Sequence, residues 1–134
     1  MADAGILVAS VIGRASRGGL YLDVGALHGL FEGFQSGLTM SYRVRNITRG
    51  EAGPVREYVL AGPTCDPDDT IQKGARLGDT RVWDRLIFSP TGAYTDVYAT
   101  EFMGFSRPNF YVTAKVGDEP GFWQECVGSG RETA

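Results

Sequence analysis

The chain has 134 residues, of which 43% are hydrophobic and 22% are charged, and its formal net charge is −3 at pH 7. These values are ordinary for one folded domain that is large enough to bury a core. No stretch of the sequence concentrates basic residues, so a nucleic-acid partner is not expected. The longest apolar run, residues 5–13, is too short to cross a bilayer and lacks the preceding basic residues of a secretory signal. A membrane partner is therefore not expected either.

Cysteine and histidine are scarce, which limits the possible redox and metal chemistry. The two cysteines, Cys65 and Cys126, are too few for a disulfide framework, so a reduced, cytoplasmic setting is expected. With a single histidine and no Cys-x-x-Cys pair, no metal site is expected.

Nineteen glycines divide the chain into short segments rich in β-branched and aromatic residues. In chain order, strands are predicted over residues 5–13, 18–25, 38–48, 56–62, 81–89 and 109–116. Helix is predicted over a turn or two of residues 26–34 and, more strongly, over 93–102. Short strands separated by Gly-, Pro- and Asp-rich turns are typical of an all-β barrel or sandwich. We expect a single domain, 1–134, whose residues from about 125 to 134 form a flexible tail.

Cys65 and Asp66 stand in a predicted loop after a strand, in the stretch GPTCDPDD. Loops at strand ends often carry functional groups. The carboxylates of Asp66, Asp68 and Asp69 disfavour a thiolate nearby, so Cys65 would be a poor nucleophile by itself. One interpretation is a neutral thiol that donates or relays a proton. The other is a buried loop cysteine beside a solvated acidic turn.

A second candidate site begins at Gly92, at the start of the predicted helix. Backbone N–H groups there, with the hydroxyls of Tyr94 and Thr95, would suit a phosphate. The alternative is that Tyr94 is a half-buried core aromatic. The aromatic cluster at 101–111 is open to two similar interpretations, a pocket lip or part of the core.

The basic side chains offer no obvious catalytic group. His28 is interpreted as a packed histidine rather than a base. Neither Lys73 nor Lys115 lies in the apolar setting that activates a lysine for covalent chemistry.

Several motifs occur in an order that resembles the C-terminal β-barrel domain of fold-type III pyridoxal-phosphate decarboxylases. This is the family of ornithine, lysine, diaminopimelate and carboxynorspermidine decarboxylases. The motifs run from about Leu20 to Tyr111 and read LYLDVGALHGLFEG, VLAGPTCDPDDTI, WDRLIFSPTGAYT and ATEFMGF. GPTCD followed by GAYT is far more specific than either motif alone. The resemblance implies a mainly β, Greek-key-like barrel or sandwich with one or two short helices.

In that family a TIM-barrel domain holds pyridoxal phosphate, and the β domain completes the active site of a neighbouring subunit in a head-to-tail dimer. By motif, Cys65 resembles the thiol that donates a proton in the neighbour's site. Asp66 resembles the carboxylate that binds the distal amino group of a diamino-acid substrate. Tyr94 is similar to the tyrosine that contacts the cofactor phosphate, and Phe102 to the aromatic residue near the substrate pocket.

The sequence departs from the family pattern at three positions. Met103 replaces the polar residue of the family's FNGF motif, and Trp83 replaces a glycine common in its VGD turn. Val24 stands where some members carry a substrate-binding aspartate, so the identity of the substrate is not carried over.

A TIM barrel needs about 250 residues, and the family's cofactor-binding lysine, phosphate loop and stacking histidine have no counterpart here. The chain is therefore not expected to bind pyridoxal phosphate covalently, nor to decarboxylate an amino acid alone. The first hypothesis is a split decarboxylase, a lyase in which this chain supplies Cys65, Asp66 and Tyr94 to a separate TIM-barrel subunit that binds the cofactor. The substrate would then be an amino acid or a related metabolite, and the isolated domain would expose an apolar patch where the partner packs.

Two alternatives remain open. In one, the chain is a stand-alone isomerase, cyclase or hydrolase that needs no pyridoxal phosphate and uses Cys65, Asp66, Tyr94 and His28 as acid–base groups. In the other, it is a non-catalytic module that binds and regulates a full-length decarboxylase. A homodimer is expected where no other partner is present.

Overall fold

The computed structural model describes residues 5–37, 41–64, 66–92, 95, 97–109 and 111. Its strands are β1 (Leu7–Arg14), β2 (Gly19–Leu22), β3 (Arg43–Asn46), β4 (Arg56–Ala61), β5 (Thr70–Leu77) and β6 (Arg85–Ser89). Its helical elements are the 3-10 turn η2 (Ala26–His28), the short helix α1 (Phe31–Gln35) and the 3-10 turn η3 (Phe102–Gly104). The predicted mainly β fold with short helices is therefore confirmed.

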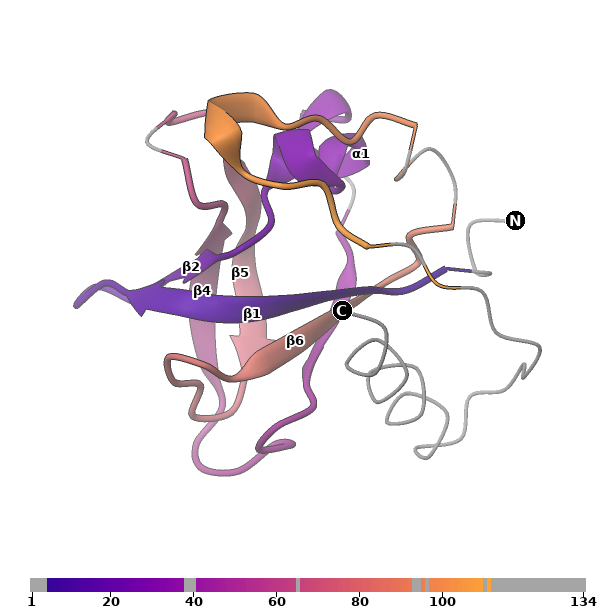
Figure 1. Ribbon diagram of the computed structural model, residues 1–134. Helices are drawn as coiled ribbons and strands as arrows, with labels where there is room; N and C mark the ends of the chain where they lie inside the picture. Colours follow the sequence, from indigo (N-terminus) through magenta and orange to yellow (C-terminus); the bar gives the residue numbers. More distant parts are fainter. Residues whose placement is uncertain are drawn as a thin grey trace.

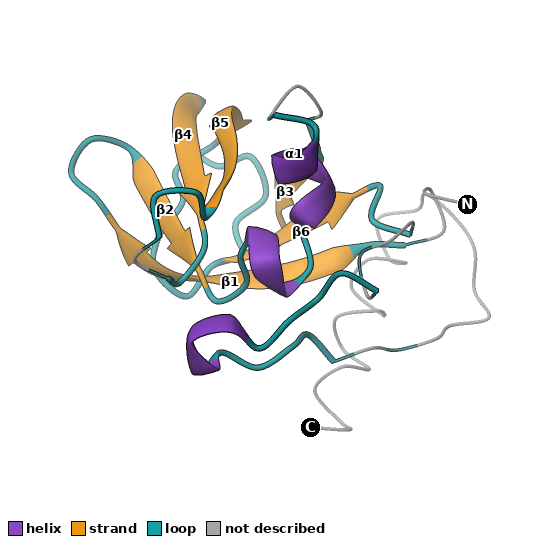
Figure 2. Ribbon diagram, turned by 90° about the horizontal axis from the view of Figure 1, so that it is seen from above, coloured by secondary structure: helices purple, strands orange, loops and turns teal. Residues whose placement is uncertain are grey.

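The six strands form one sheet in the order β3-β6-β1-β2-β4-β5, which curls into a nearly closed barrel (Figures 1 and 2). β1 is antiparallel to both β2 and β6, and β2 is parallel to β4. As a result β2, β4 and β6 all finish at the same end of the barrel. We call this the exit end; it carries the segments that follow Leu22, Ala61 and Ser89.

The core lies inside the barrel and is built by alternation along the strands. In β1 the side chains of Leu7, Ala9 and Val11 point inward, whereas Val8 and Ile12 are exposed. Fully buried apolar side chains from the other strands and from the segment after η2 complete it: Leu20, Leu22, Leu30, Leu60, Ile71, Leu86 and Phe88. Burying this apolar surface is the main stabilising term for a domain of this size.

β5 was not predicted, because its sequence hides the strand pattern. Polar Gln72 and Lys73 and then Gly74 interrupt the apolar side chains, and Gly74 has a φ of 70°. The register against β4 shifts twice along this strand. Such bulges add residues to one strand and break the alternation by which a strand is recognised.

The predicted helix at 93–102 is wrong across its described residues, which form turns and irregular backbone up to the start of η3. The physical reason is that this segment is hydrogen-bonded to η2. The backbone N–H and the hydroxyl of Thr100 both donate to the carbonyl of Leu27, at 2.9 and 2.8 Å. Apart from Asn109 and Tyr111, the predicted strand 109–116 lies outside the described residues, and so does the tail at 125–134.

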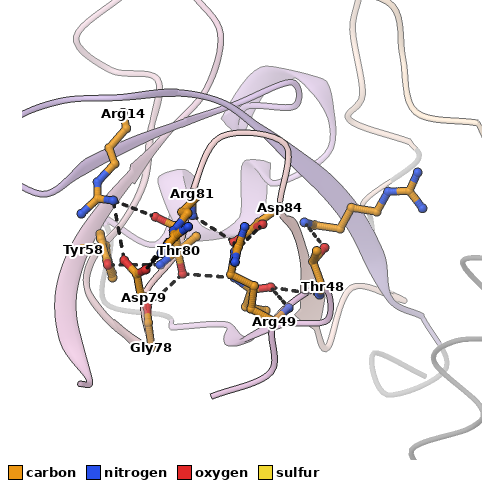
Figure 3. A network of polar contacts seen from close by, with 11 residues as sticks. Arg14, Thr48, Arg49, Tyr58, Gly78, Asp79, Thr80, Arg81 and Asp84 are labelled. Atoms are coloured by element: carbon orange, nitrogen blue, oxygen red, sulfur yellow. Dashed lines mark hydrogen bonds and ion pairs between the residues drawn. The ribbon is translucent and has the colours of Figure 1, made fainter. Parts of the chain in front are cut away.

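At the barrel end opposite the exit end, the buried carboxylate of Asp84 fixes the turn before β6 (Figure 3). It accepts hydrogen bonds from Asn46 Nδ2 at 2.9 Å, from the Arg81 N–H at 2.9 Å and from Arg49 Nε at 3.0 Å. Within the turn, Trp83 has a φ of 72°. Among the helices of the described ranges, none is long and apolar enough to span a membrane.

Candidate functional site

The exit end gathers the segments that carry the sequence motifs. The loop 62–69 follows β4, and the turn at 24–28 follows β2. The segment 97–105 passes over the helical turns and appears in orange beside α1 (Figure 1). Because β2 and β4 pair in parallel, their following loops are neighbours although they are about 40 residues apart.

Asp66 sits half-buried in the loop after β4 and is shaped by local hydrogen bonds. Its Oδ1 accepts from the Asp68 N–H at 2.9 Å, and its own N–H donates to Thr64 Oγ at 3.4 Å. Among the described residues, nothing donates a hydrogen bond to its Oδ2. The carboxylate therefore retains an oxygen that can bind a cation or an ammonium group at the surface.

Asp69 differs sharply from its acidic neighbours, because it is only 2% exposed. Its Oδ1 accepts from the Ala26 N–H at 2.9 Å. Its Oδ2 accepts from the Thr64 N–H at 3.1 Å and from the Thr64 hydroxyl at 2.6 Å. Three donors compensate the buried charge. The interpretation of residues 66–69 as a solvated acidic turn is therefore wrong for Asp69.

Two glycines let this carboxylate lie between the two loops. A Cβ built on either Gly25 or Gly62 falls directly on the carboxylate of Asp69. Neither site has a positive φ, so the requirement is space rather than backbone conformation. Two glycines, one after each of the parallel strands, were the sequence signal that could have revealed the buried acid.

His28 is fully buried, and both ring nitrogens have hydrogen-bond partners. Nδ1 accepts from the Gly25 N–H at 3.2 Å, so Nε2 carries the proton and donates to the Phe102 carbonyl at 3.0 Å. The ring also meets Phe105 edge-on, with centroids 5.8 Å apart. The interpretation of His28 as a packed histidine is confirmed. Its use as an acid–base group by a stand-alone enzyme is contradicted, because it cannot reach a ligand.

Large apolar side chains are exposed along the segment that His28 holds. Phe102 is 40% exposed and Met103 is 56% exposed, and Val97 and Phe105 are exposed as well. Met103 has a φ of 60°, inside η3. Exposed apolar side chains grouped on one short segment are typical of a contact surface.

Two of the predicted site residues, Cys65 and Tyr94, lie outside the described residues. Their roles therefore stay predictions. The structure does place Asp66 and Phe102 at the same end of the barrel. It also connects them through hydrogen bonds that involve Asp69, Ala26 and His28.

A covalent pyridoxal-phosphate site does not fit the described residues. Lys73 is the lysine among them, and it is exposed on β5 beside Gly74. No group of three or more His, Cys, Asp or Glu side chains in the described part of the chain is arranged to hold a metal ion. Within the described ranges, the exit end thus offers a carboxylate and an apolar surface to a ligand, but no lysine that could bind the cofactor covalently.

Comparisons with known proteins agree with this arrangement. Residues 2–92 match the sequence model of a family described as pyridoxal-dependent decarboxylase, C-terminal sheet domain. The chain is 34% identical over 86 residues to ornithine decarboxylase of Mus musculus, covering 62% of this chain and 19% of that protein. It is 31% identical over 102 residues to lysine/ornithine decarboxylase of Selenomonas ruminantium, covering 74% of this chain and 25% of that protein.

A solved structure gives the same result. The lysine/ornithine decarboxylase of Vibrio vulnificus, complexed with cadaverine, superposes with a TM-score of 0.68 at 38% identity. The match covers 79% of this chain and 29% of that chain. The chain therefore spans about a quarter or less of the curated relatives it matches.

Proposed function

Because this chain belongs to the pyridoxal-dependent decarboxylases, as their C-terminal sheet domain, we propose that it is the small subunit of a split amino-acid decarboxylase. It supplies one wall of the active site. The lysine, the phosphate loop and the stacking histidine that hold the cofactor lie on a separate TIM-barrel subunit. The chain carries out no decarboxylation by itself.

The observation that carries the proposal is the presentation of Asp66 at the exit end. One carboxylate oxygen of Asp66 is held by the Asp68 N–H, and no described residue donates to the other, which leaves it for a ligand. A carboxylate fixed in this way suits the distal ammonium group of a diamino acid. Relatives named lysine/ornithine decarboxylase support that substrate class.

The other site residues fit the same substrate. Phe102 exposes an apolar ring at the same end of the barrel, which suits the methylene chain of lysine or ornithine. By motif, Cys65 donates a proton to the product, and Tyr94 donates a hydrogen bond to the cofactor phosphate. Pyridoxal phosphate, held by the other subunit, supplies the electron sink for loss of CO2.

The test begins with the companion subunit. The tagged chain is purified from its native cells, and the eluate is examined for a second polypeptide with the absorbance of bound pyridoxal phosphate. The reconstituted pair is expected to release CO2 from lysine or ornithine, whereas neither chain does so alone. A chain that recovers no such polypeptide, or a pair without activity, contradicts the proposal.

Matched variants then test the role of Asp66. In Asp66→Ala, loss of a charged hydrogen bond is expected to raise KM for the diamino acid by about 10- to 100-fold. Asp68→Ala is the control, because the bond from residue 68 to Asp66 uses its backbone N–H and survives the change. Equal KM values for the two variants would show that Asp66 does not bind substrate.

A further inference from the structure

We propose that Asp69 and His28 are positioning residues that hold Asp66 and Phe102 in one rigid frame. The inference deepens the proposed function and rests on it in one respect, that Asp66 and Phe102 contact the ligand. Neither positioning residue can touch a ligand itself, because Asp69 is 2% exposed and His28 is fully buried.

The first part of the frame is a set of hydrogen bonds within the loop 62–69, on both sides of position 65 in the sequence. Thr64 donates both its N–H and its hydroxyl to the Asp69 carboxylate. The carbonyl of Asp66 accepts from the Asp69 N–H at 3.0 Å. The residues before and after Cys65 are thus both bonded to one buried residue, and the hydrogen bond from the Gly62 N–H to the Asp69 carbonyl, at 2.8 Å, closes the loop at its base.

The second part passes from this loop to the turn after β2. Asp69 Oδ1 accepts from the Ala26 N–H, and Gly25 lies against the same carboxylate with no room for a Cβ. A carboxylate bonded to two segments in a water-poor setting tolerates little displacement of either segment, because an unpaired buried charge is costly. The loop after β4 and the turn after β2 therefore move together or not at all.

The third part passes from η2 to the exposed apolar segment. The His28 ring lies between the Gly25 N–H and the Phe102 carbonyl and is bonded to both. Thr100 adds its two hydrogen bonds to Leu27. Phe102 is thereby tied to the same turn that Asp69 holds from the other side. Linked hydrogen bonds of this kind are expected to respond cooperatively when one is removed.

The first test asks whether the frame transmits a local change, and it uses the chain alone. Amide hydrogen exchange is measured for Asp69→Asn, Thr64→Val and His28→Asn. The first two remove or weaken the bonds to Asp69. In His28→Asn the shorter side chain is expected to keep a bond to the Gly25 N–H and to lose the one to the Phe102 carbonyl. Thr70→Val is the control, because it removes a hydroxyl at the start of β5 whose partner among the described residues is the carbonyl of the exposed Pro67.

Each of these three variants is expected to speed amide exchange about tenfold, both in the segment that carries the substitution and in the segment at the other end of the frame. Tenfold corresponds to the loss of about one hydrogen bond. For Asp69→Asn and Thr64→Val the distant amide is that of Phe105, and for His28→Asn it is that of Asp69. Thr70→Val and Thr64→Ser, which keeps the donor, are expected to leave both amides unchanged. Faster exchange confined to the substituted segment would overturn the proposal. Thr64→Val keeps the test decisive if Asp69→Asn does not fold.

The second test uses the reconstituted pair with lysine or ornithine. Thr64→Val is expected to raise KM about tenfold in addition to the small drop in the thermal unfolding midpoint that one lost hydrogen bond causes, whereas Thr64→Ser keeps the wild-type KM. A structural role alone would move the thermal midpoint and not KM. An inactive wild-type pair would contradict the proposed function but not the frame, since the exchange measurement needs no activity. An active pair whose KM is unaffected by Thr64→Val would overturn the positioning role alone.

Discussion

The side-chain amide of Gln72 forms two hydrogen bonds with the backbone of Tyr42. The Tyr42 N–H donates to Oε1 at 2.9 Å, and Nε2 donates to the Tyr42 carbonyl at 3.3 Å. Gln72 lies on β5 and Tyr42 directly precedes β3, and these two strands are the edges of the sheet. One side chain thus pairs across the seam of the barrel as a neighbouring strand would.

This pairing predicts that Gln72→Ala lowers the free energy of unfolding by about 1–2 kcal/mol, because both backbone groups of Tyr42 lose their partner. Urea unfolding followed by tryptophan fluorescence measures the change. Gln35→Ala, on the exposed side of α1, is the control and is expected to change stability by less than about 0.5 kcal/mol. Equal stability of the two variants would mean that the amide does not close the barrel.

Trp83 has a φ of 72° although its side chain is 74% exposed, so little packing compensates the backbone strain. Trp83→Gly is therefore expected to raise the free energy of unfolding by about 1 kcal/mol. Trp83→Ala removes the same indole but keeps a Cβ at positive φ, and it should not share the gain. Calorimetric unfolding midpoints of the two variants give the comparison. A glycine variant no more stable than the alanine variant would refute the assignment of strain.

Met103, within η3, is a second residue with a left-handed backbone, with a φ of 60° and a ψ of 21°. Asparagine tolerates this left-handed conformation better than methionine does. We expect Met103→Asn to stabilise the turn by a few tenths of a kcal/mol, seen as slower amide exchange at Gly104 and Phe105. Met103→Leu is the matched control and should not slow that exchange. Slower exchange in both variants would point to side-chain packing instead.

The lowered pKa of Asp79 predicts that the stability of the fold depends on pH. Its hydrogen bond from Arg81 is the main cause that lowers the pKa of this carboxyl below 3.8, and the charges of Arg14 and Arg49 act in the same direction. A lowered pKa in the folded state means that ionised Asp79 stabilises the fold above pH 3.8 and that this contribution disappears as the pH falls through the folded pKa. The stability difference between wild type and Asp79→Asn should therefore shrink from pH 7 to pH 3 in urea unfolding. A constant difference would contradict this.

Asp23 provides a control of opposite sign. Desolvation is the main cause that raises the pKa of this carboxyl above 3.8, against the opposing hydrogen bond from the Ser10 N–H. The folded state then binds this proton more tightly than the unfolded state does. The contribution of Asp23 to the stability of the fold is therefore greatest below pH 3.8 and is lost as the pH rises through the folded pKa. Relative to wild type, Asp23→Asn should gain stability between pH 3 and pH 7. A loss of stability relative to wild type in Asp23→Asn between pH 3 and pH 7, as expected for Asp79→Asn, would refute the assignment for Asp23.

The fold could be predicted wherever residues alternate or glycines bound a strand, as in β1, β2 and β4. Prediction failed where a long-range contact decided the local structure. Gly74 and its bulge concealed β5, and the bonds of Thr100 to Leu27 replaced a helix that the apolar spacing favoured. Neither effect can be read from neighbouring residues.

The candidate site shows the same division. Asp66 and Phe102 were identified by motif, and the structure places both at the exit end. Asp69 was missed, because three acids in four residues look alike in sequence, and only the approach of the turn after β2 distinguishes the buried one. Burial of a side chain by a segment 40 residues away has no local signature.

Because β2 and β4 run parallel, the loops that follow them lie at the exit end, and the turn that Asp84 fixes lies at the opposite end of the barrel. Apart from Gly25, Gly62 and Asp69, residues of the loops that leave β2 and β4 can change without contact to the turn that Asp84 holds at the opposite rim. Under the proposed function, natural variation in this domain can therefore alter the ligand that the exit end binds while the opposite rim keeps the strands in register. Ligand preference and barrel assembly are free to evolve apart.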